Sequence, residues 1–535
     1  MRIFSISGHC LYLSNSNATE NRKIFEEPGL EKPNRKSQTG CFDLAVVGGG
    51  VGGLALGALA QRSGLKSILC ESHTKLGGCA GYFHRENYTF DCGATALMGL
   101  DAGEPIRELL NRIGMSFHAV RTPEYRMCLP SGDLILTNQP DNWEKTIRNR
   151  FPHLGENAAR FWRIQESIGK TLFKASPGLP RSPIRSVADV IHNLRILGVS
   201  GTLCAATSAI TVEGLMRLLG VNQDPEFRAI VAMLLQDTAQ AGPETVPLAN
   251  AAACLQAYRF GLSRPKGSMK ALVEGIGEAF SKSGGDLRMA TIVDRIRPME
   301  NERGFLIQTR RGEQIQARQV AMNLPLDLAA RLLDLNLIDN RFGKLEQRSR
   351  AQWSAFTAYA AIEASHLKGH NALFHHVLQD FGKPIHDGNN VLISLSPEGD
   401  KGYAGPEIRI ATMSTHVRAE EWSGLVSKEY EWKKEEYAGR MKAALDRAFP
   451  GVEGALRHIE FASPRSFARY TRRTLGRVGG PPVSRLRSNL MAVDPGVLGK
   501  GLWVVGDSVF PGQGTMAVVM CAMRVLERMT GREGL

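Results

Sequence analysis

The feature that most constrains this chain's fold is a glycine-rich turn that directly follows a short apolar run. Residues 43–47 (Asp-Leu-Ala-Val-Val) are typical of a buried parallel strand. Gly48, Gly50 and Gly53 then give the spacing G-x-G-x-x-G, and residues 54–61 continue at helical spacing. In such a turn the first glycine permits the tight bend, the second lets backbone approach a pyrophosphate, and the third lets the helix pack closely on the strand. The sequence therefore predicts a strand–turn–helix unit that binds a dinucleotide at the helix N-terminus.

A second strand and an acidic residue follow in the expected order. Residues 67–70 are apolar, and Glu71 comes next, 23 residues after Gly48. An acid at this position receives the two hydroxyls of an adenosine ribose. The alternative is a solvated surface carboxylate. The complete order of strand, turn, helix, strand and acid favours a dinucleotide site.

A second pair of glycines bears on which dinucleotide is bound. Gly77 and Gly78 lie in KLGGCAGYF (residues 75–83), and YTFDCGAT (residues 88–95) follows. An NAD dehydrogenase has no need of this extension, whereas FAD binds extended and must pass over more backbone. Taken alone, the pair fits a left-handed turn equally well.

The far end of the chain carries another glycine-rich loop that opens a helix, GDSVFPGQGTMAVVM (residues 506–520). Backbone N–H groups at a helix N-terminus stabilise negative charge on a reduced flavin ring. The alternative is a buried strand–turn–helix with an ordinary Asp cap.

Together these segments resemble the FAD-binding signature of the amine oxidase and phytoene desaturase superfamily. Residues 77–95 are similar to carotenoid desaturases and carotene cis–trans isomerases, and most of all to the carotenoid C-3',4' desaturases. Residues 264–296, 462–480 and 501–529 resemble the later blocks of the same family, in order. The resemblance spans about residue 41 to the end.

The resemblance implies a role for each motif position. The backbone of Val293 meets the adenine, and Asp507, after Gly506, bonds the ribityl hydroxyls. The loop through Gly512 and Gly514 opens a helix under the pyrimidine edge of the flavin. The expected FAD-binding residues are Gly48, Gly50, Gly53, Glu71, Gly77, Gly78, Val293, Gly506, Asp507, Gly512, Gly514, Thr515 and Met516.

We expect two or three domains, because 535 residues are too many for one ordinary core, and the fold class that we expect is α/β. A Rossmann-like FAD-binding domain, a parallel sheet with helices, is interrupted by a mixed-sheet substrate domain and by a helical, membrane-facing subdomain. The expected segments are a disordered leader (1–40), a first FAD-binding segment (41–125), the helical subdomain (126–247), a second FAD-binding segment (248–333), a further substrate-binding segment (334–480) and a third FAD-binding segment (481–535).

Two inserted blocks suggest where a substrate binds. Residues 182–220 are apolar, helical by spacing and basic at polar positions, which fits helices on a membrane and a plain helical subdomain equally well. The resemblance favours the membrane, because a carotene must be taken from lipid. In the second block, strand-like runs predict a mixed sheet walling an apolar tunnel. Adjacent His375 and His376 point to opposite faces of a strand, so we expect a surface pair and no metal site.

Charge and composition narrow the partners and the location. The net charge of +13 fits nucleic acid or an anionic membrane surface. Basic residues are scattered in ones and twos, so we predict no nucleic acid. No run of about twenty apolar residues predicts a transmembrane helix, and residues 1–40 are too broken by polar residues for a signal peptide. With nine scattered cysteines, these features predict a peripheral membrane protein on the cytoplasmic side.

The predicted activity is removal of a hydride and a proton from an acyclic or monocyclic carotene, which lengthens its polyene. The sequence shows no catalytic triad, carboxylate pair or metal cluster, so no catalytic residue is assigned beyond the flavin itself. Oxygen and a membrane quinone both stay open as electron acceptor, and the oligomeric state is not predicted. The alternatives are a carotene cis–trans isomerase that uses reduced FAD, a flavin amine oxidase, and a lipid carrier without turnover.

Overall fold

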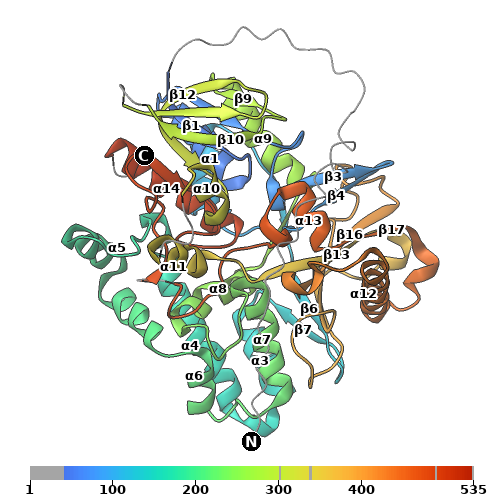
Figure 1. The fold of residues 1–535 in the computed structure, drawn as a ribbon. Coiled ribbons are helices and arrows are strands. Elements are labelled where there is room, and N and C mark those ends of the chain that lie inside the picture. Colours follow the sequence, from blue (N-terminus) through green and yellow to red (C-terminus); the bar gives the residue numbers. More distant parts are fainter. Residues whose placement is uncertain (1–40, 300–302, 336–339, 489–490, 533–535) are drawn as a thin grey trace, which may run out of the picture. The chain divides into compact units, whose positions relative to one another are not determined.

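The computed structural model describes residues 41–299, 303–335, 340–488 and 491–532, so the predicted leader of residues 1–40 lies outside the described residues. Two seven-stranded sheets organise the Cys41–Leu535 unit (Figure 1).

The first sheet is the predicted Rossmann-like sheet. Its order is β10-β11-β12-β1-β2-β9, and β18 pairs with the last residues of β12, beyond the part that pairs with β11. The strands β18, β12, β1, β2 and β9 run parallel, whereas β10, β11 and β12 are joined antiparallel. The bounds are β1 (Phe42–Val47), β2 (Ser67–Cys70), β9 (Asp286–Arg288), β10 (Val293–Pro298), β11 (Phe305–Thr309), β12 (Gln314–Met322) and β18 (Leu502–Val504). One sheet thus joins three distant stretches of the sequence.

Four helices accompany this sheet: α1 (Val51–Arg62), α2 (Pro105–Ile113), α9 (Ser268–Lys282) and α14 (Thr515–Thr530). Helix α1 contacts the other three. Its residues from Val51 to Ala60 are all buried, because glycine and alanine at most positions let neighbours approach from every side. The helix begins directly at the glycine turn, as predicted.

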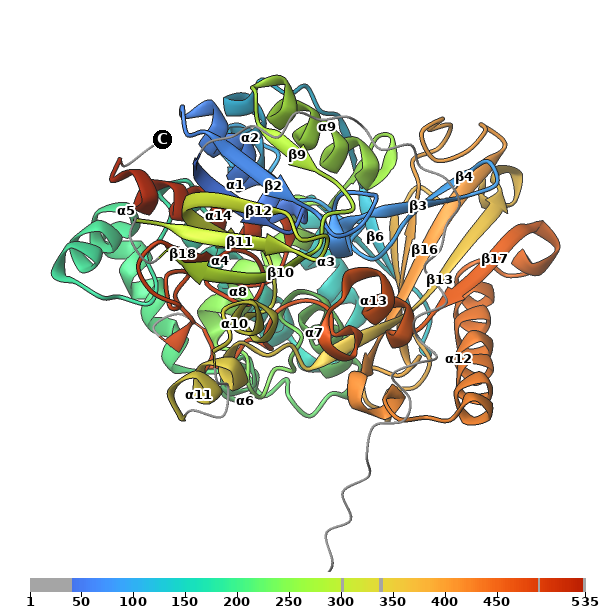
Figure 2. The same ribbon diagram turned by 45° about the horizontal axis from the view of Figure 1, so that its top comes forward.

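The second sheet is mixed, also as predicted. Its order is β17-β13-β16-β15-β14-β6-β7, antiparallel except for the parallel β14–β6 pair. Helix α12 (Ser427–Ala448) packs on one face, and Figure 2 shows it beside β13 and β17. The bounds are β6 (Glu124–Cys128), β7 (Leu134–Thr137), β13 (Trp353–Glu363), β14 (Phe374–Leu378), β15 (Asn390–Leu395), β16 (Ile408–Arg418) and β17 (Leu456–Ala462).

Helices α3 to α8 form the helical region: α3 (Pro140–Arg150), α4 (Glu156–Phe173), α5 (Val187–Ala206), α6 (Val212–Leu218), α7 (Pro225–Ala239) and α8 (Leu248–Phe260). Gly198, with φ 61°, interrupts α5. The expectation that the segment from residue 126 is helical is wrong at its start. Alternate residues of β6 and β7 are buried there, which is the period of a strand. In the described part of the chain, no helix combines the length and the apolar character needed to cross a membrane.

The remaining elements connect these regions: the hairpin β3 (Tyr82–Arg85) and β4 (Tyr88–Asp91), the pair β5 (Ala119–Arg121) and β8 (Ser263–Pro265), and the helices α10 (Leu326–Leu332), α11 (Asn340–Ser349) and α13 (Pro464–Thr471). The expected α/β fold, with a parallel dinucleotide-binding sheet and a separate mixed sheet, is confirmed.

The expected exposure of the histidine pair is wrong. His375 and His376 do point to opposite faces of β14, but both are fully buried. His375 packs against Phe449, and His376 packs against Tyr125 on the other face. β14 is an interior strand covered on both sides, which residue spacing could not reveal. No cluster of metal ligands occurs among the residues that the structure describes.

Candidate cofactor site

Four parallel strands end side by side at one edge of the first sheet. Along the order β18-β12-β1-β2, these ends lead into Gly506, Asn323, Gly48 and Glu71. Three strand spacings cover about 14 Å. In open α/β sheets, ligands bind beyond the carboxyl ends of the parallel strands. The two distant glycine loops therefore belong to one elongated site.

The first turn has the geometry that its glycines predict. Gly48 adopts φ +102°, and a Cβ on Gly53 would lie 2.1 Å from the carbonyl oxygen of Gly48. A Cβ on Gly50 would lie 2.5 Å from Nδ2 of the Asn323 side chain. Gly50 caps α1 without a side-chain hydrogen bond, so the first amides of the helix keep their capacity for an anion. This is the arrangement that a pyrophosphate requires.

Glu71 lies beside this turn, as expected for the ribose acid. Its side chain is buried, and Oε2 accepts a 2.6 Å hydrogen bond from the amide of Gly49. The other oxygen, Oε1, accepts from the amide of His73 at 2.7 Å. The amide of Thr291 donates to the carbonyl oxygen of Glu71 at 2.8 Å, which brings the segment before Val293 to the same place. The residues assigned to the adenosine end thus lie together.

The second glycine pair packs directly on the first turn. The amide of Gly77 donates to the carbonyl oxygen of Gly49 at 2.8 Å, and Gly77 adopts φ +108°. A Cβ on Gly78 would lie 3.6 Å from the Cα of Gly50. The two turns therefore form one continuous backbone surface, which suits a ligand longer than its pyrophosphate.

The C-terminal loop presents open backbone. Gly506, Gly512 and Gly514 adopt φ values of +126°, +116° and +103°. A Cβ on Gly512 or Gly514 would meet no described heavy atom within 4 Å. Helix α14 begins at Thr515 with neither a side-chain cap nor an acidic residue in its first turn. Met516 faces Gly99, where an added Cβ would lie 2.9 Å from its Cγ. Unhindered amides at a helix N-terminus fit the pyrimidine edge of a flavin, where negative charge develops when the ring is reduced.

Asp507 has a partner that the sequence analysis missed. Its Oδ2 lies 2.6 Å from Nη2 of Arg473, and both side chains are largely buried. Burial alone would lower the pKa of Arg473, but the Asp507 carboxylate raises it above its usual range. The Arg473 guanidinium also donates to the carbonyl oxygen of Gly479. The available signal was the pair Arg472 and Arg473 in residues 462–480, the block that resembles the stretch near the flavin in the family.

Asn323 was also missed. It follows β12, and its amide donates to the carbonyl oxygen of Val47 at 2.8 Å. Its side chain lies next to Gly48, and a Cβ on Gly506 would lie 3.0 Å from its Oδ1. Asn323 therefore stands between the two glycine loops. A single polar residue after an apolar run gave no motif by which to find it.

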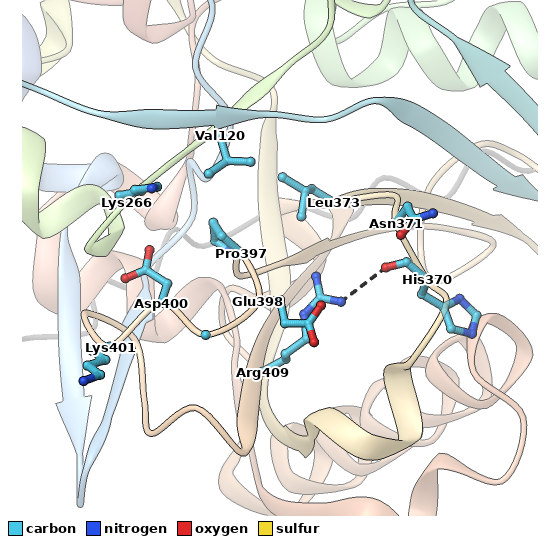
Figure 3. Close-up of a pocket in the computed structure, with 11 residues that line it drawn as sticks. Val120, Lys266, His370, Asn371, Leu373, Pro397, Glu398, Asp400, Lys401 and Arg409 are labelled. Atoms are coloured by element: carbon cyan, nitrogen blue, oxygen red, sulfur yellow. Dashed lines mark hydrogen bonds between the residues drawn. The ribbon is translucent and has the colours of Figure 1, made fainter.

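A pocket elsewhere on the chain does not fit this chemistry. It holds about 480 Å³ and is lined mainly by polar residues, including Lys266, Glu398, Asp400 and Arg409 (Figure 3). None of its lining residues belongs to the glycine loops. Its charged walls are unsuited to an apolar substrate.

Comparisons with known proteins agree with this geometry. The family description "NAD(P)-binding Rossmann-like domain" matches residues 46–113. The solved structure of an oxidoreductase from Methanosarcina mazei is 18% identical, with a TM-score of 0.61, over 90% of this chain and 99% of that one. A putrescine oxidase variant shares the fold at 14% identity and a TM-score of 0.61, over 92% and 99% of the two chains. The fold and the paired loops define an FAD-dependent oxidoreductase.

Sequence relatives narrow the class. The chloroplastic prolycopene isomerase of Arabidopsis thaliana is 24% identical over 508 residues, which cover 90% of this chain and 82% of the relative. The lycopene-forming phytoene desaturase of Pseudescherichia vulneris is 23% identical, over 62% of this chain and 65% of the relative. The carotenoid 3,4-desaturase of Haloarcula japonica is 23% identical, over 52% and 55%. The chain is therefore similar to carotenoid desaturases and to a carotene isomerase over between half and nine-tenths of its length.

Proposed function

We propose that this protein is an FAD-dependent carotenoid desaturase that acts on an acyclic or monocyclic carotene at a membrane surface. The observation that carries the proposal is the row of strand ends that joins the two glycine loops in one elongated site. Similarity to carotenoid enzymes over nine-tenths of the chain supports the substrate class.

Bound FAD supplies a two-electron acceptor for hydride removal. The chain's own residues hold and orient it: the α1 amides at the pyrophosphate, Glu71 at the ribose, and Asp507 at the ribityl chain. The uncapped N-terminus of α14 stabilises negative charge at the flavin end. By orienting the flavin, these residues would set the position that a carbon atom of the substrate must occupy to lose its hydride.

The test is pigment extraction from cells that express the protein beside a supply of an acyclic carotene. A desaturase yields a product with two hydrogens fewer and a red-shifted absorption. The matched control is Gly53→Val, whose side chain collides with the carbonyl oxygen of Gly48 and closes the turn. The proposal would be contradicted if the unaltered protein binds flavin but leaves the pigment unchanged, as Gly53→Val does.

A carotene cis–trans isomerase is the second candidate, favoured by the long alignment with prolycopene isomerase. The same extraction separates the two, because isomerisation leaves the product mass unchanged. An amine oxidase is the less favoured alternative, because amine oxidases share the fold at 14% identity, whereas the sequence relatives act on carotenoids by name.

An exposed apolar surface supports the membrane aspect of the proposal. Nine of the fifteen large apolar side chains exposed among the described residues lie between Ile184 and Leu218. Val187, Val199 and Leu218 are each at least 75% exposed. Figure 1 shows α5, which carries most of them, at the edge of the described residues. With the net charge of +13, this surface suits peripheral binding to anionic lipid.

Oxygen or a membrane quinone completes the proposed cycle by reoxidising the flavin. Hydrogen peroxide formed during turnover would identify oxygen. Turnover that proceeds without oxygen only when a quinone is added would identify the quinone.

A further inference from the structure

The C-terminal end of α7 lies against the flavin loop. Gln513, between Gly512 and Gly514, donates from Nε2 to the carbonyl oxygen of Asp237 at 3.4 Å. One turn later, the carbonyl oxygen of Gln240 accepts a 2.9 Å hydrogen bond from the indole of Trp353. This end of the helix is therefore fixed between the flavin loop and β13 of the second sheet.

The side chain of Asp237 faces two histidines of that sheet. Oδ2 lies 2.8 Å from Nε2 of His376, and Oδ1 lies 3.9 Å from Nδ1 of His416. His376 is fully buried, whereas Asp237 remains 13% exposed. Neither Oδ2 of Asp237 nor Nε2 of His376 has an aligned hydrogen-bond partner in the described part of the chain. The two atoms therefore face each other at hydrogen-bond distance, and no other described group competes for either of them.

The contacts of His376 orient its ring toward Asp237. Its Nδ1 lies 2.9 Å from Oδ1 of Asn390. An amide oxygen only accepts, so Nδ1 is the donor in this contact. Nε2 is therefore the ring nitrogen that faces Oδ2 of Asp237.

We propose that the Asp237–His376 pair accepts the proton that leaves the carotene during desaturation. The inference rests on the proposed function. One C–H bond of the substrate gives a hydride to the bound flavin, which is the oxidant. The neighbouring C–H bond gives its proton to the pair, and its electron pair becomes the new C=C bond. Asp237 is the partly exposed member of the pair, and the fully buried His376 holds it in position.

The other titratable groups around the pair come from three elements and are poorly suited to this task. Burial raises the pKa of Tyr125 and Tyr258 far above the usual value, with Asp237 adding to the effect. Burial lowers the pKa of His416, against the opposing effect of Asp237 and with His386 lowering it further. These groups stay neutral near pH 7.

The first experiment does not depend on turnover. Imidazole ¹⁵N resonances of the FAD-loaded protein are followed against pH in the wild type and in Asp237→Asn. We expect the His376 signal to titrate at lower pH in Asp237→Asn than in the wild type, because the carboxylate beside Nε2 is gone. Identical titrations in the two proteins would show that the two side chains do not act together and would overturn the proposal.

The second experiment measures the pH profile of desaturation. We expect Asp237→Asn to lower kcat about 100-fold or more, with KM and FAD content retained, because general base catalysis contributes about 10²–10⁴. His376→Gln should shift the acidic limb, and Asp237→Glu should restore some of the lost kcat. The matched control is His153→Gln. His153 pairs with Asp224 at 2.6 Å, at the opposite end of α7 from Asp237. Its loss should change neither kcat nor the pH profile of desaturation.

The outcomes are distinct. A wild type that binds FAD but makes no elongated product contradicts the proposed function, while the ¹⁵N titration still reports on the pair. An active wild type with an unchanged Asp237→Asn profile overturns the proton-acceptor role alone. If Asp237→Asn fails to fold, Asp237→Glu and His376→Gln decide: a pH profile identical to wild type in both contradicts the proposal.

Discussion

The Asp507–Arg473 pair provides the sharpest test of the flavin end of the site. Replacing Asp507 by Ala removes the expected ribityl contact and also leaves the Arg473 guanidinium buried without its carboxylate. Breaking a buried ion pair costs about 3–5 kcal/mol. Because the two side chains remain 16% and 14% exposed, we expect the low end, about 3 kcal/mol, in the free energy of unfolding. Loss of the ribityl contact should separately weaken FAD binding by about 1.5–3 kcal/mol.

A double-mutant cycle separates these two effects. Urea unfolding of the FAD-free protein is compared for Asp507→Ala, Arg473→Leu and the double variant. We expect the double variant to lose about 1–3 kcal/mol less free energy of unfolding than the two single variants lose together, because removing both charges leaves no unpaired ion. Flavin fluorescence should still show weakened FAD binding in the double variant.

The control is the exposed pair Arg318–Asp43 on the same sheet, with Nη1 and Oδ1 2.9 Å apart. Its double-mutant cycle should give a coupling below about 1 kcal/mol. Strictly additive losses for Asp507 and Arg473, or normal FAD binding by both Asp507 variants, would refute the assignment of this pair to the site.

Three further predictions follow from the same geometry. Glu71→Ala should weaken FAD binding by about 1.5–3 kcal/mol, measured by flavin titration, and an unchanged affinity would make Glu71 only a surface acid. Gly514→Val should keep flavin bound but lower turnover about 100-fold, since the misplaced loop moves the ring. Gly531→Ala, at the other end of α14, should cost only about 1–2 kcal/mol of stability, and equal turnover in both glycine variants would place the loop elsewhere. Val199→Ser with Leu203→Ser should reduce vesicle co-sedimentation, and binding of the unaltered protein should fall with salt; indifference to both would favour a plain helical subdomain.

The strands of the dinucleotide sheet that lead into the glycine turns and Glu71 could be predicted because their signals are local, whereas β11 and β12 were not predicted. Strand, turn, helix and acid follow one another between Phe42 and Glu71, and the strand and helix of the closing loop are equally contiguous. What the sequence could not supply was contact between distant residues. Asp507 and Arg473 are separated by 34 positions, and Asn323 lies far from both glycine loops in the sequence.

The second sheet shows the same limit from another side. Alternation correctly placed His375 and His376 on opposite faces, but exposure depends on what covers each face. Helix α12 covers one face, and residues of the helical region contact the other. The pairing of His376 with Asp237 joins residues 139 positions apart, and no spacing rule links them.

The order of strands in the first sheet also governs when the site comes into being. β18 and α14 are the last of the described elements to leave the ribosome, yet β18 pairs with β12 and α14 packs on α1. Until residue 502 has been synthesised, the last residues of β12 (Val320–Met322) lack the strand that pairs with them, and the glycine turn after β1 lacks the second glycine loop. A chain terminated early would keep the adenosine half of the site without the flavin half. Binding of a whole FAD molecule would therefore require that β18 and α14 have been synthesised and have packed on β12 and α1.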